Sequence, residues 1–234
     1  MTITAVDYHT GGTRCQTLVL VSKRQQQDSY KRSTCATLPS DHGYVRVMAR
    51  ARREFTAGGT YHVFSRGSNR RAIFRFDSDR TDFLECLERV VVRHELDCLA
   101  YCLMPNHFHL VLRTPDGRLS DAMKALNGRY SLRFNKRHGC DAHLFKNRFG
   151  AVAQKTESQL LWTLRYVVWN PVRSGLCGDP AEWPWSSYCA SIGEVVPPQF
   201  LARRRLLSYF GDVPEVAMAR YRDLVHPPHA DFGV

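Results

Sequence analysis

Between Gly58 and Pro171 the spacing of apolar residues switches repeatedly between strand-like and helical, and this succession restricts the folds open to the chain. Four segments have the pattern of strands: Thr60 to Arg66, Leu96 to Leu103, His107 to Thr114, and Phe149 to Gln154. Three have helical spacing: one from Asp77 or Ser78, one from about Leu119 to His138, and one from Leu160 to Trp169. The order β-α-β-β-α-β plus a helix predicts an α+β fold, a ferredoxin-like split βαβ sandwich with an antiparallel sheet.

Turn and cap signals set the expected ends of these elements. Met104-Pro105-Asn106 makes a short turn between two strands, and Gly139 stops the second helix. The third helix is expected to end at Asn170-Pro171, because the residue before a proline disfavours the helical conformation.

The 234 residues can hold one domain with additional segments, or two small domains. Residues 1–47 show no sustained periodicity, and we interpret them as disordered or as lying upstream of a true start at Met48. Residues 48–190 form the predicted main domain. Residues 191–234 form a predicted C-terminal helical tail, in which the span from Leu206 to Leu224 indicates one or two helices.

The chain is basic, with 33 Lys and Arg against 22 Asp and Glu, a net charge of +11. The densest basic block, Arg113 to Arg148, fits either a solvated surface or a polyanionic partner, most simply nucleic acid. No segment approaches the roughly 18 apolar residues of a membrane span. Asp7 and His9 interrupt the region where a signal peptide would be apolar, so we expect no export. The eight scattered cysteines are expected to be free thiols in a reducing cytosol.

Two histidines stand two residues apart on the third predicted strand. His107 and His109 therefore point to one face, while Phe108, Leu110 and Leu112 point to the core. Two imidazoles on one face can bind a first-row metal ion, although they do not identify it. By itself the pattern also fits a strand with two exposed histidines.

The third predicted helix carries a second candidate pair. Its apolar residues occupy one arc of roughly 120°, and Tyr166 lies on the other side, with Asn170 one turn beyond it. An amide can ligate a metal ion, and a metal-bound phosphate can be attacked by a tyrosine. A surface tyrosine on an amphipathic helix is the alternative interpretation.

Several blocks together resemble one family, the REP-associated tyrosine transposases of the single-tyrosine HUH transposase superfamily. The blocks are Gly58-Gly-Thr-Tyr-His-Val-Phe-Ser-Arg-Gly67, Tyr101-Cys-Leu-Met-Pro-Asn-His-Phe-His-Leu110, Leu126-Asn-Gly-Arg-Tyr130, Leu144-Phe-Lys-Asn-Arg-Phe149, Leu164-Arg-Tyr-Val-Val-Trp-Asn-Pro-Val172 and Trp183-Pro-Trp-Ser-Ser-Tyr188. The resemblance runs from about Met48 to Ala190, and it implies that residues 48–190 are an HUH catalytic domain. Residues 205–225 resemble the tail of longer members, and residues 1–47 match nothing in the family.

The resemblance implies a role for each residue of the two candidate pairs. His107 and His109 would be the HUH pair, Tyr166 the nucleophile, and Asn170 the third metal ligand. Such proteins cleave single-stranded DNA beside a hairpin with Mg²⁺ or Mn²⁺, leaving a 5′-phosphotyrosine and a free 3′-hydroxyl. A cytoplasmic, nucleoid-associated protein is implied, and both a homodimer and a monomer stay open.

Basic residues are the expected DNA contacts. On the second helix Arg129, Arg133 and Lys136 or Arg137 form one stripe suited to phosphates. Arg66, Arg70 and Arg71 end the first strand and enter a polar loop, and Arg148 precedes the fourth strand. Trp183 and Trp185 could stack on bases, but we favour an aromatic plug that holds the C-terminal segment.

Alternatives remain for both the nucleophile and the function. Tyr130 is a rival nucleophile that core packing also explains, and His62 and His143 are expected to be solvent-facing or hydrogen-bonded rather than ligands. The competing functions are a transposase-derived module that binds hairpin nucleic acid without cutting and, less favoured, a metallohydrolase that uses water as nucleophile.

Overall fold

The computed structural model describes the chain except residues 1, 11–12, 22–34, 39–44, 49–52 and 227–234, and it describes side chains from Arg53 to His226. The chain divides into two compact units, Met1–Arg53 and Glu54–Val234. Within the first unit, β1 (Thr2–Thr10) pairs antiparallel with β2 (Thr13–Val21), and β3 (Cys35–Leu38) with β4 (Val45–Met48). The other residues of the predicted disordered segment lie outside the described part, so that prediction and the start at Met48 stay predictions.

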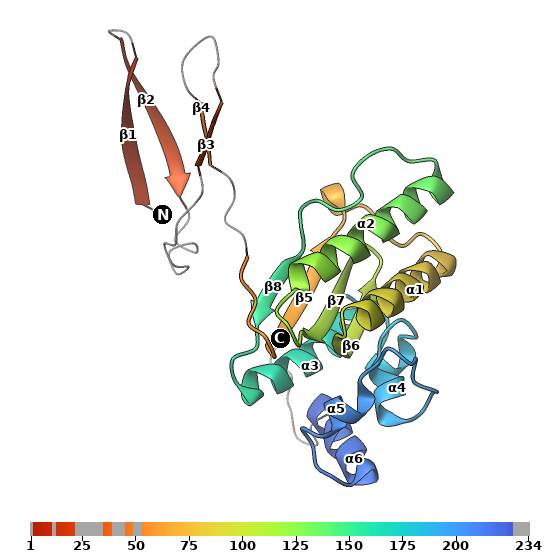
Figure 1. The fold of residues 1–234 in the computed structure, drawn as a ribbon. Coiled ribbons are helices and arrows are strands. Elements are labelled where there is room, and N and C mark those ends of the chain that lie inside the picture. Colours follow the sequence, from red (N-terminus) through yellow and green to blue (C-terminus); the bar gives the residue numbers. More distant parts are fainter. Residues whose placement is uncertain (1, 11–12, 22–34, 39–44, 49–52, 227–234) are drawn as a thin grey trace. The chain divides into compact units, whose positions relative to one another are not determined.

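The second unit is built on one antiparallel sheet in the order β6-β7-β5-β8 (Figure 1). Its strands are β5 (Thr60–Arg66), β6 (Asp97–Met104), β7 (His107–Arg113) and β8 (Gly150–Ala153). Strands β5 and β7 are the two central strands and pair with each other, whereas β8 and β6 lie at the two edges. The predicted α+β split βαβ arrangement is therefore confirmed.

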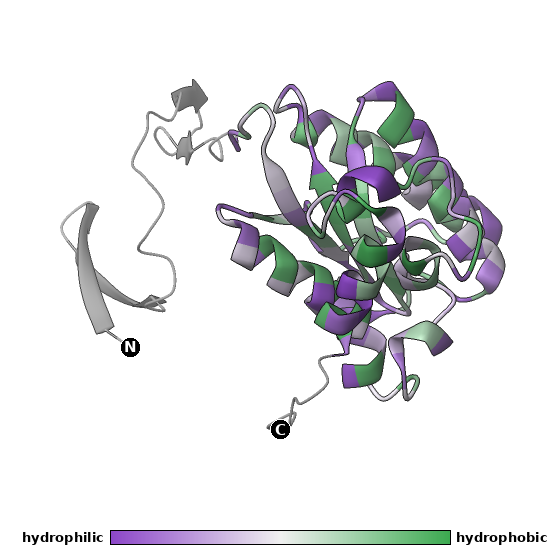
Figure 2. Cartoon of the chain, turned by 90° about the horizontal axis from the view of Figure 1, so that it is seen from below, coloured by the Kyte–Doolittle hydropathy of each residue, from purple (hydrophilic) through white to green (hydrophobic). Residues whose placement is uncertain are grey.

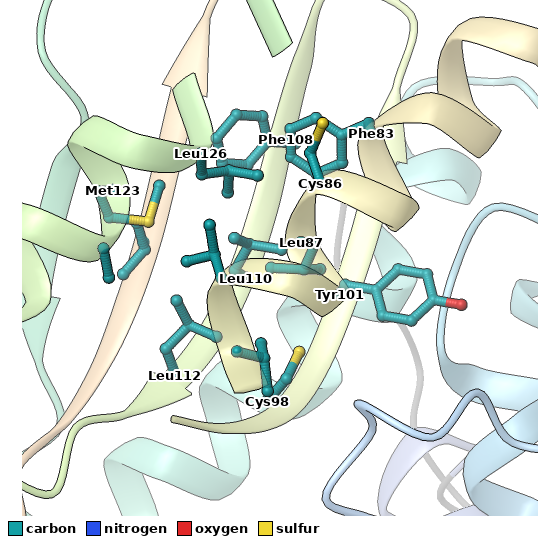
Figure 3. Close-up of a cluster of buried hydrophobic side chains, with 14 of the residues drawn as sticks. Phe83, Cys86, Leu87, Cys98, Tyr101, Phe108, Leu110, Leu112, Met123 and Leu126 are labelled. Carbon is teal, nitrogen blue, oxygen red and sulfur yellow. The ribbon is translucent and has the colours of Figure 1, made fainter. Parts of the chain in front are cut away.

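Helices α1 (Asp77–Arg93) and α2 (Leu119–His138) lie side by side over one face of the sheet (Figure 1). The core beneath them contains Phe108, Leu110 and Leu112 from β7, with Phe83 from α1 and Met123 from α2 (Figure 3). Each of these side chains is fully buried, as the strand alternation predicts.

The opposite face carries α3 (Glu157–Arg173) and the short C-terminal helices α4 (Tyr188–Ile192), α5 (Arg203–Leu207) and α6 (Pro214–Val225). Two single-turn 3₁₀ helices, η2 (Ser68–Arg70) and η3 (Pro180–Glu182), complete the unit. Leu206 and Tyr221 are fully buried and join the same core cluster as β6 and α3. The described part of the predicted tail, up to His226, thus packs on the sheet within the second unit. In Figure 2 the helices carry both hydrophobic and hydrophilic positions, as helices with one buried face do.

The predicted bounds of helix α3 are wrong at both ends. The helix begins at Glu157 rather than Leu160, and it does not end at Asn170-Pro171 but includes Pro171 and continues to Arg173. The last turn is held by other bonds, because the backbone N–H groups of Ser174 and Leu176 both donate to the Pro171 carbonyl oxygen. The proline therefore removes one helical hydrogen bond without breaking the helix.

Six cysteines in the described part of the chain are free, and three of them, Cys86, Cys98 and Cys102, are buried. Among the described helices, none is long and apolar enough to cross a membrane.

Candidate active site

Strand β7 presents the two predicted histidines to the face that α3 covers. Their ring centroids lie 4.9 Å apart with the planes at 90°. His109 is buried, with 6% of its surface exposed, and His107 is half-buried. The intervening Phe108 is fully buried on the opposite face and fixes the strand, so the two imidazoles are held on a rigid element.

Helix α3 places Tyr166 directly against this pair. The Tyr166 ring centroid lies 5.6 Å from that of His109, in an edge-on arrangement. Thr156 is the N-cap of this helix, and its hydroxyl accepts a hydrogen bond from the Gln159 backbone N–H. Tyr166 and Asn170 therefore reach the strand that carries the histidines, and the structure brings together all four predicted residues.

The position of Tyr166 differs in detail from the helical-wheel prediction, which placed it opposite the core. The buried arc of α3 is wider than its apolar residues suggest, because the polar side chains Thr163 and Asn170 are also buried. Thr163 is satisfied by a 2.7 Å hydrogen bond from its hydroxyl to Gln154 Oε1. Tyr166 consequently lies at the margin of the buried face, half-buried and next to the histidines.

A third histidine belongs to the site. His62, on β5, shares a 2.9 Å hydrogen bond with His109, between His62 Nε2 and His109 Nδ1, and its ring lies 5.8 Å from that of Tyr166. The expectation of a hydrogen-bonded His62 is met, but its partner was not foreseen. The alternation of β5 already indicates that His62, Phe64 and Arg66 share one face of the strand. The sequence does not give the pairing register of β5 with β7, in which Phe64 lies opposite His109.

Burial keeps these imidazoles neutral at neutral pH. It lowers the pKa of His62 to about 4. Burial, and then the nearby Arg66 guanidinium, lowers the pKa of His107 to about 4. The pKa of His109 is well below its ordinary value, through burial first and then the charges of His62, His107 and Arg66. Neutral imidazole is the form that ligates metal ions.

The hydrogen bonds around these residues suit a metal ligand set of two imidazoles and one amide. His107 Nδ1 donates to Asn106 Oδ1 at 2.6 Å, which leaves Nε2 of that ring as the ligand atom. Asn170 Nδ2 donates to the Tyr166 carbonyl oxygen at 2.9 Å, and the Asn170 side chain also hydrogen-bonds His109. The amide oxygen is the atom left to face that imidazole, so the residues present fit a divalent cation. Across the described residues, no three His, Cys, Asp or Glu side chains form a metal-holding group.

These side chains line a pocket of about 460 Å³. Its walls are formed by His62, Phe64, Ser65, Arg66, His107, His109, Tyr166, Asn170 and Ser174. The volume falls in the range of small-ligand pockets, and Arg66 gives it a positive charge. A phosphate group is therefore the kind of ligand that this pocket suits.

The predicted basic contacts are divided between two faces of the sheet. Arg66 lines the pocket, and Arg70 and Arg71 are exposed at and just after the η2 turn that follows. Arg148 is exposed just before β8. The residues on α2 lie over the opposite face.

The basic residues predicted to form one stripe on α2 fall into two groups, those that form ion pairs with α1 and those that do not. Arg133 pairs with Asp82 and Glu85, and Arg137 pairs with Asp79 and Asp82, all on α1. These contacts offset the charge of Arg133 and Arg137 within the helix pair. Arg129 and Lys136 are exposed and form no ion pair with any described residue.

The rival nucleophile lies in the core. Tyr130 is 1% exposed, and its hydroxyl donates to the Ile73 carbonyl oxygen beneath α1. Burial raises its pKa, which disfavours the phenolate. His143 is exposed, as expected.

Trp183 and Trp185 are half-buried where the C-terminal segment meets the sheet. Trp183 Nε1 donates to the Leu103 carbonyl oxygen at 3.2 Å, and the Arg80 guanidinium lies 5.4 Å from the Trp185 ring. Trp185 also packs against the core beneath α1 and α2. These contacts favour the plug over a base-stacking role.

The chain is similar to known transposases in sequence and in fold. Residues 56–170 match the family model described as "Transposase IS200 like", a range that includes both histidines, Tyr166 and Asn170. Over 177 residues the chain is 22% identical to a Haemophilus influenzae protein named as a candidate REP-associated tyrosine transposase, covering 71% of this chain and 100% of that one.

A solved structure, that of a REP-associated tyrosine transposase bound to a REP hairpin, has a similar fold. The TM-score is 0.55 at 20% sequence identity, over 64% of this chain and 89% of the other. On this sheet of order β6-β7-β5-β8, residues 56–170 form a domain of the IS200-like transposase family, and the chain resembles the REP-associated tyrosine transposases.

Proposed function

We propose that this chain is a metal-dependent, single-stranded DNA endonuclease and strand transferase that acts beside hairpins through a 5′-phosphotyrosine. The observation that carries the proposal is the meeting of Tyr166 with the His107–His109 strand in one pocket, with ring centroids 5.6 Å apart for Tyr166 and His109. Packing of α3 on the sheet does not require a tyrosine next to three histidines.

In the proposed first step the Tyr166 oxygen, after losing its proton to solvent, attacks the phosphorus of a phosphodiester. The new bond joins that oxygen to phosphorus, and the bond from phosphorus to the 3′-oxygen breaks. The leaving 3′-oxygen takes a proton from water and becomes a free hydroxyl. In the reverse step a 3′-hydroxyl attacks the phosphotyrosine and releases Tyr166, so strands rejoin with no external energy source.

His107, His109 and Asn170 would hold Mg²⁺ or Mn²⁺, which would neutralise charge on the attacked phosphate. His62 fixes the orientation of His109 through its 2.9 Å hydrogen bond, and Asn106 does the same for His107. Arg66 at the pocket wall attracts the phosphate. These groups are positioned before the substrate arrives, so the proposed catalysis rests on preorganised electrostatics.

The test is a covalent-adduct assay with a labelled library of single-stranded hairpins in Mn²⁺, Mg²⁺ or EDTA, resolved on a denaturing gel. We expect a metal-dependent protein–DNA adduct that Tyr166→Phe abolishes, because the variant lacks the attacking oxygen. Tyr130→Phe serves as the matched control and should retain the adduct.

Two outcomes would contradict the proposal. Hairpin binding without an adduct under any metal would favour the alternative, a transposase-derived module that binds but does not cut. An adduct that survives Tyr166→Phe would place the nucleophile elsewhere.

For DNA binding, the partner we propose is single-stranded DNA with a hairpin, held at phosphates by Arg66, Arg70, Arg71 and Arg148 and by the unpaired Arg129 and Lys136 on α2. We expect Arg129→Ala to weaken hairpin binding and to reduce the slope of log K against log salt by about 0.7–0.9. Arg133→Ala should change that slope less, because Asp82 and Glu85 already pair with Arg133. Binding measured at several salt concentrations checks this, and equal slopes for the two variants would refute it.

A further inference from the structure

One aromatic side chain at the site has a face open to solvent. Trp162 is 59% exposed, although an indole is among the largest apolar groups a protein can leave in water. It lies on α3 one turn before Tyr166, and the two rings are stacked, with centroids 5.2 Å apart and planes within 10°. A pair four residues apart on a helix contributes only about 0.2–0.5 kcal/mol, so helix stability alone does not account for an exposed tryptophan.

Other groups around Tyr166 complete a surface suited to a single strand. The Arg173 guanidinium lies 5.5 Å from the Tyr166 ring and is exposed, two turns beyond it on the same helix. Phe64 lines the pocket and is 37% exposed. An open indole face, a tyrosine and a cation therefore follow one another along α3, next to the pocket.

We propose that Trp162 is a base-stacking platform that binds the base of the nucleotide adjoining the phosphate that Tyr166 attacks. This proposal rests on the proposed function, because it describes how the single-stranded DNA crosses the same site. Stacking suits this role because every nucleobase has a π-face, so a single aromatic ring binds single strands with little dependence on sequence. The cation of Arg173 complements the phosphate of that nucleotide.

The test measures binding without cleavage, using the full chain in EDTA. The probe is a hairpin oligonucleotide with a single-stranded thymine tail that carries 2-aminopurine at one position at a time. Affinity comes from fluorescence anisotropy, and stacking comes from quenching of 2-aminopurine. A blunt hairpin without the tail is the reference substrate.

We expect Trp162→Ala to weaken binding of the tailed hairpin about 5- to 150-fold and to abolish quenching at one tail position. Trp162→Phe, which keeps an aromatic ring, should restore most of both. Leu132→Ala removes another exposed apolar side chain, 75% exposed on α2, and should change neither. The blunt hairpin should bind all four proteins equally.

Equal affinity and quenching in the wild type and Trp162→Ala would overturn the platform. Slower adduct formation by Trp162→Ala at unchanged affinity would also overturn it, because that result means that the indole only orients Tyr166. If the proposed function is wrong, the wild-type protein forms no adduct with any metal. The binding measurements in EDTA do not depend on cleavage, so they still test Trp162.

Discussion

At the residue scale, the site depends on which side chains the strand register sets opposite one another. His62 reaches His109, and Phe64 packs near both rings, with centroid distances of 5.3 Å to His62 and 6.2 Å to His109. Across β8 the partner of Phe64 is Gly150. A Cβ atom at Gly150 would clash with the Phe64 ring, so the ring can occupy this position only because residue 150 has no side chain.

We therefore predict that Gly150→Ala displaces the Phe64 ring and disturbs the pocket more than the fold. The ring is partly exposed and can rotate away, so the free energy of unfolding should fall by only about 1 kcal/mol. The rate of adduct formation should fall at least about tenfold. Thermal denaturation and the adduct assay measure the two effects.

Gly128→Ala is the control, because a Cβ there meets nothing within 4 Å, in the middle of exposed helix surface. It should stabilise the protein by about 0.5–1 kcal/mol and leave the adduct unchanged. An unaltered adduct rate in Gly150→Ala would show that Phe64 does not shape the site.

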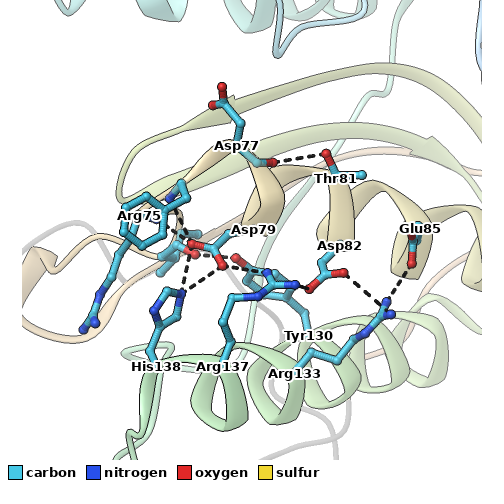
Figure 4. A network of polar contacts seen from close by, with 12 residues as sticks. Arg75, Asp77, Asp79, Thr81, Asp82, Glu85, Tyr130, Arg133, Arg137 and His138 are labelled. Atoms are coloured by element: carbon cyan, nitrogen blue, oxygen red, sulfur yellow. Dashed lines mark hydrogen bonds and ion pairs between the residues drawn. The ribbon is translucent and has the colours of Figure 1, made fainter.

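At the scale of elements, α1 and α2 are joined by a buried carboxylate (Figure 4). Asp79, fully buried at the start of α1, accepts hydrogen bonds from the Arg75 and Phe76 backbone N–H groups at 2.8 and 3.1 Å. Arg137 Nη1 and His138 Nε2, at the end of α2, each reach Asp79 Oδ1 at 2.9 Å. One side chain thus caps a helix and anchors the end of its neighbour.

Burial alone would raise the pKa of Asp79, but the hydrogen bonds from Arg137, His138 and the two backbone groups outweigh it and lower the pKa. We predict that Asp79→Asn reduces the free energy of unfolding by about 1–3 kcal/mol at pH 7, because donors lose a charged acceptor. A carboxylate whose pKa is lowered by folding stabilises above its unfolded pKa of about 4 and stops doing so as the pH falls through the folded value. The difference between the variant and the wild type should therefore shrink as the pH falls below the unfolded pKa of about 4 and towards the lower folded value.

Urea denaturation at pH 7 and near pH 2.5 measures this difference. Asp77→Asn is the matched control, since the Asp77 carboxylate is 78% exposed and its ion pair, among the described residues, is with Arg80. It should cost less than about 0.5 kcal/mol. A loss for Asp79→Asn that is equally large at both pH values would rule out the carboxylate as its cause.

At the scale of the whole molecule, the two ends of the chain have different relations to the sheet. Residues 1–53 form a unit of their own, whereas α5 and α6 contribute fully buried Leu206 and Tyr221 to the core over β6. Trp169 Nε1 on α3 also donates to the Val225 carbonyl oxygen at 2.8 Å. The C-terminal helices are therefore part of what holds α3 over the histidines.

We predict that a chain starting at Met48 keeps its full melting temperature and adduct activity. A chain ending at Gly193 should lose both, because the apolar face of β6 and α3 becomes exposed, at a cost of about 1.5–3 kcal/mol per large side chain. Melting curves and the adduct assay on the two truncations check this. Lost activity in the first truncation would refute the start at Met48, and a stable, active second truncation would refute the structural role of α5 and α6.

The sequence alone predicted the element order, the sheet type and the shared face of His107 and His109. It also paired Tyr166 with Asn170 one helical turn apart. These features follow from periodicities of two and 3.6 residues, which act between near neighbours in the chain. The resemblance to a family then joined the two pairs into one site, a step that spacing could not supply.

Tertiary structure decided the rest. It placed His62 and Phe64 at the site, engaged Arg133 and Arg137 with the acids of α1, and kept α3 helical through Pro171. Each of these outcomes depends on strand register or on helix packing, which are contacts between residues far apart in the sequence. No local pattern records such contacts, so the neighbours of the nucleophile were determined only when the sheet and α3 came together.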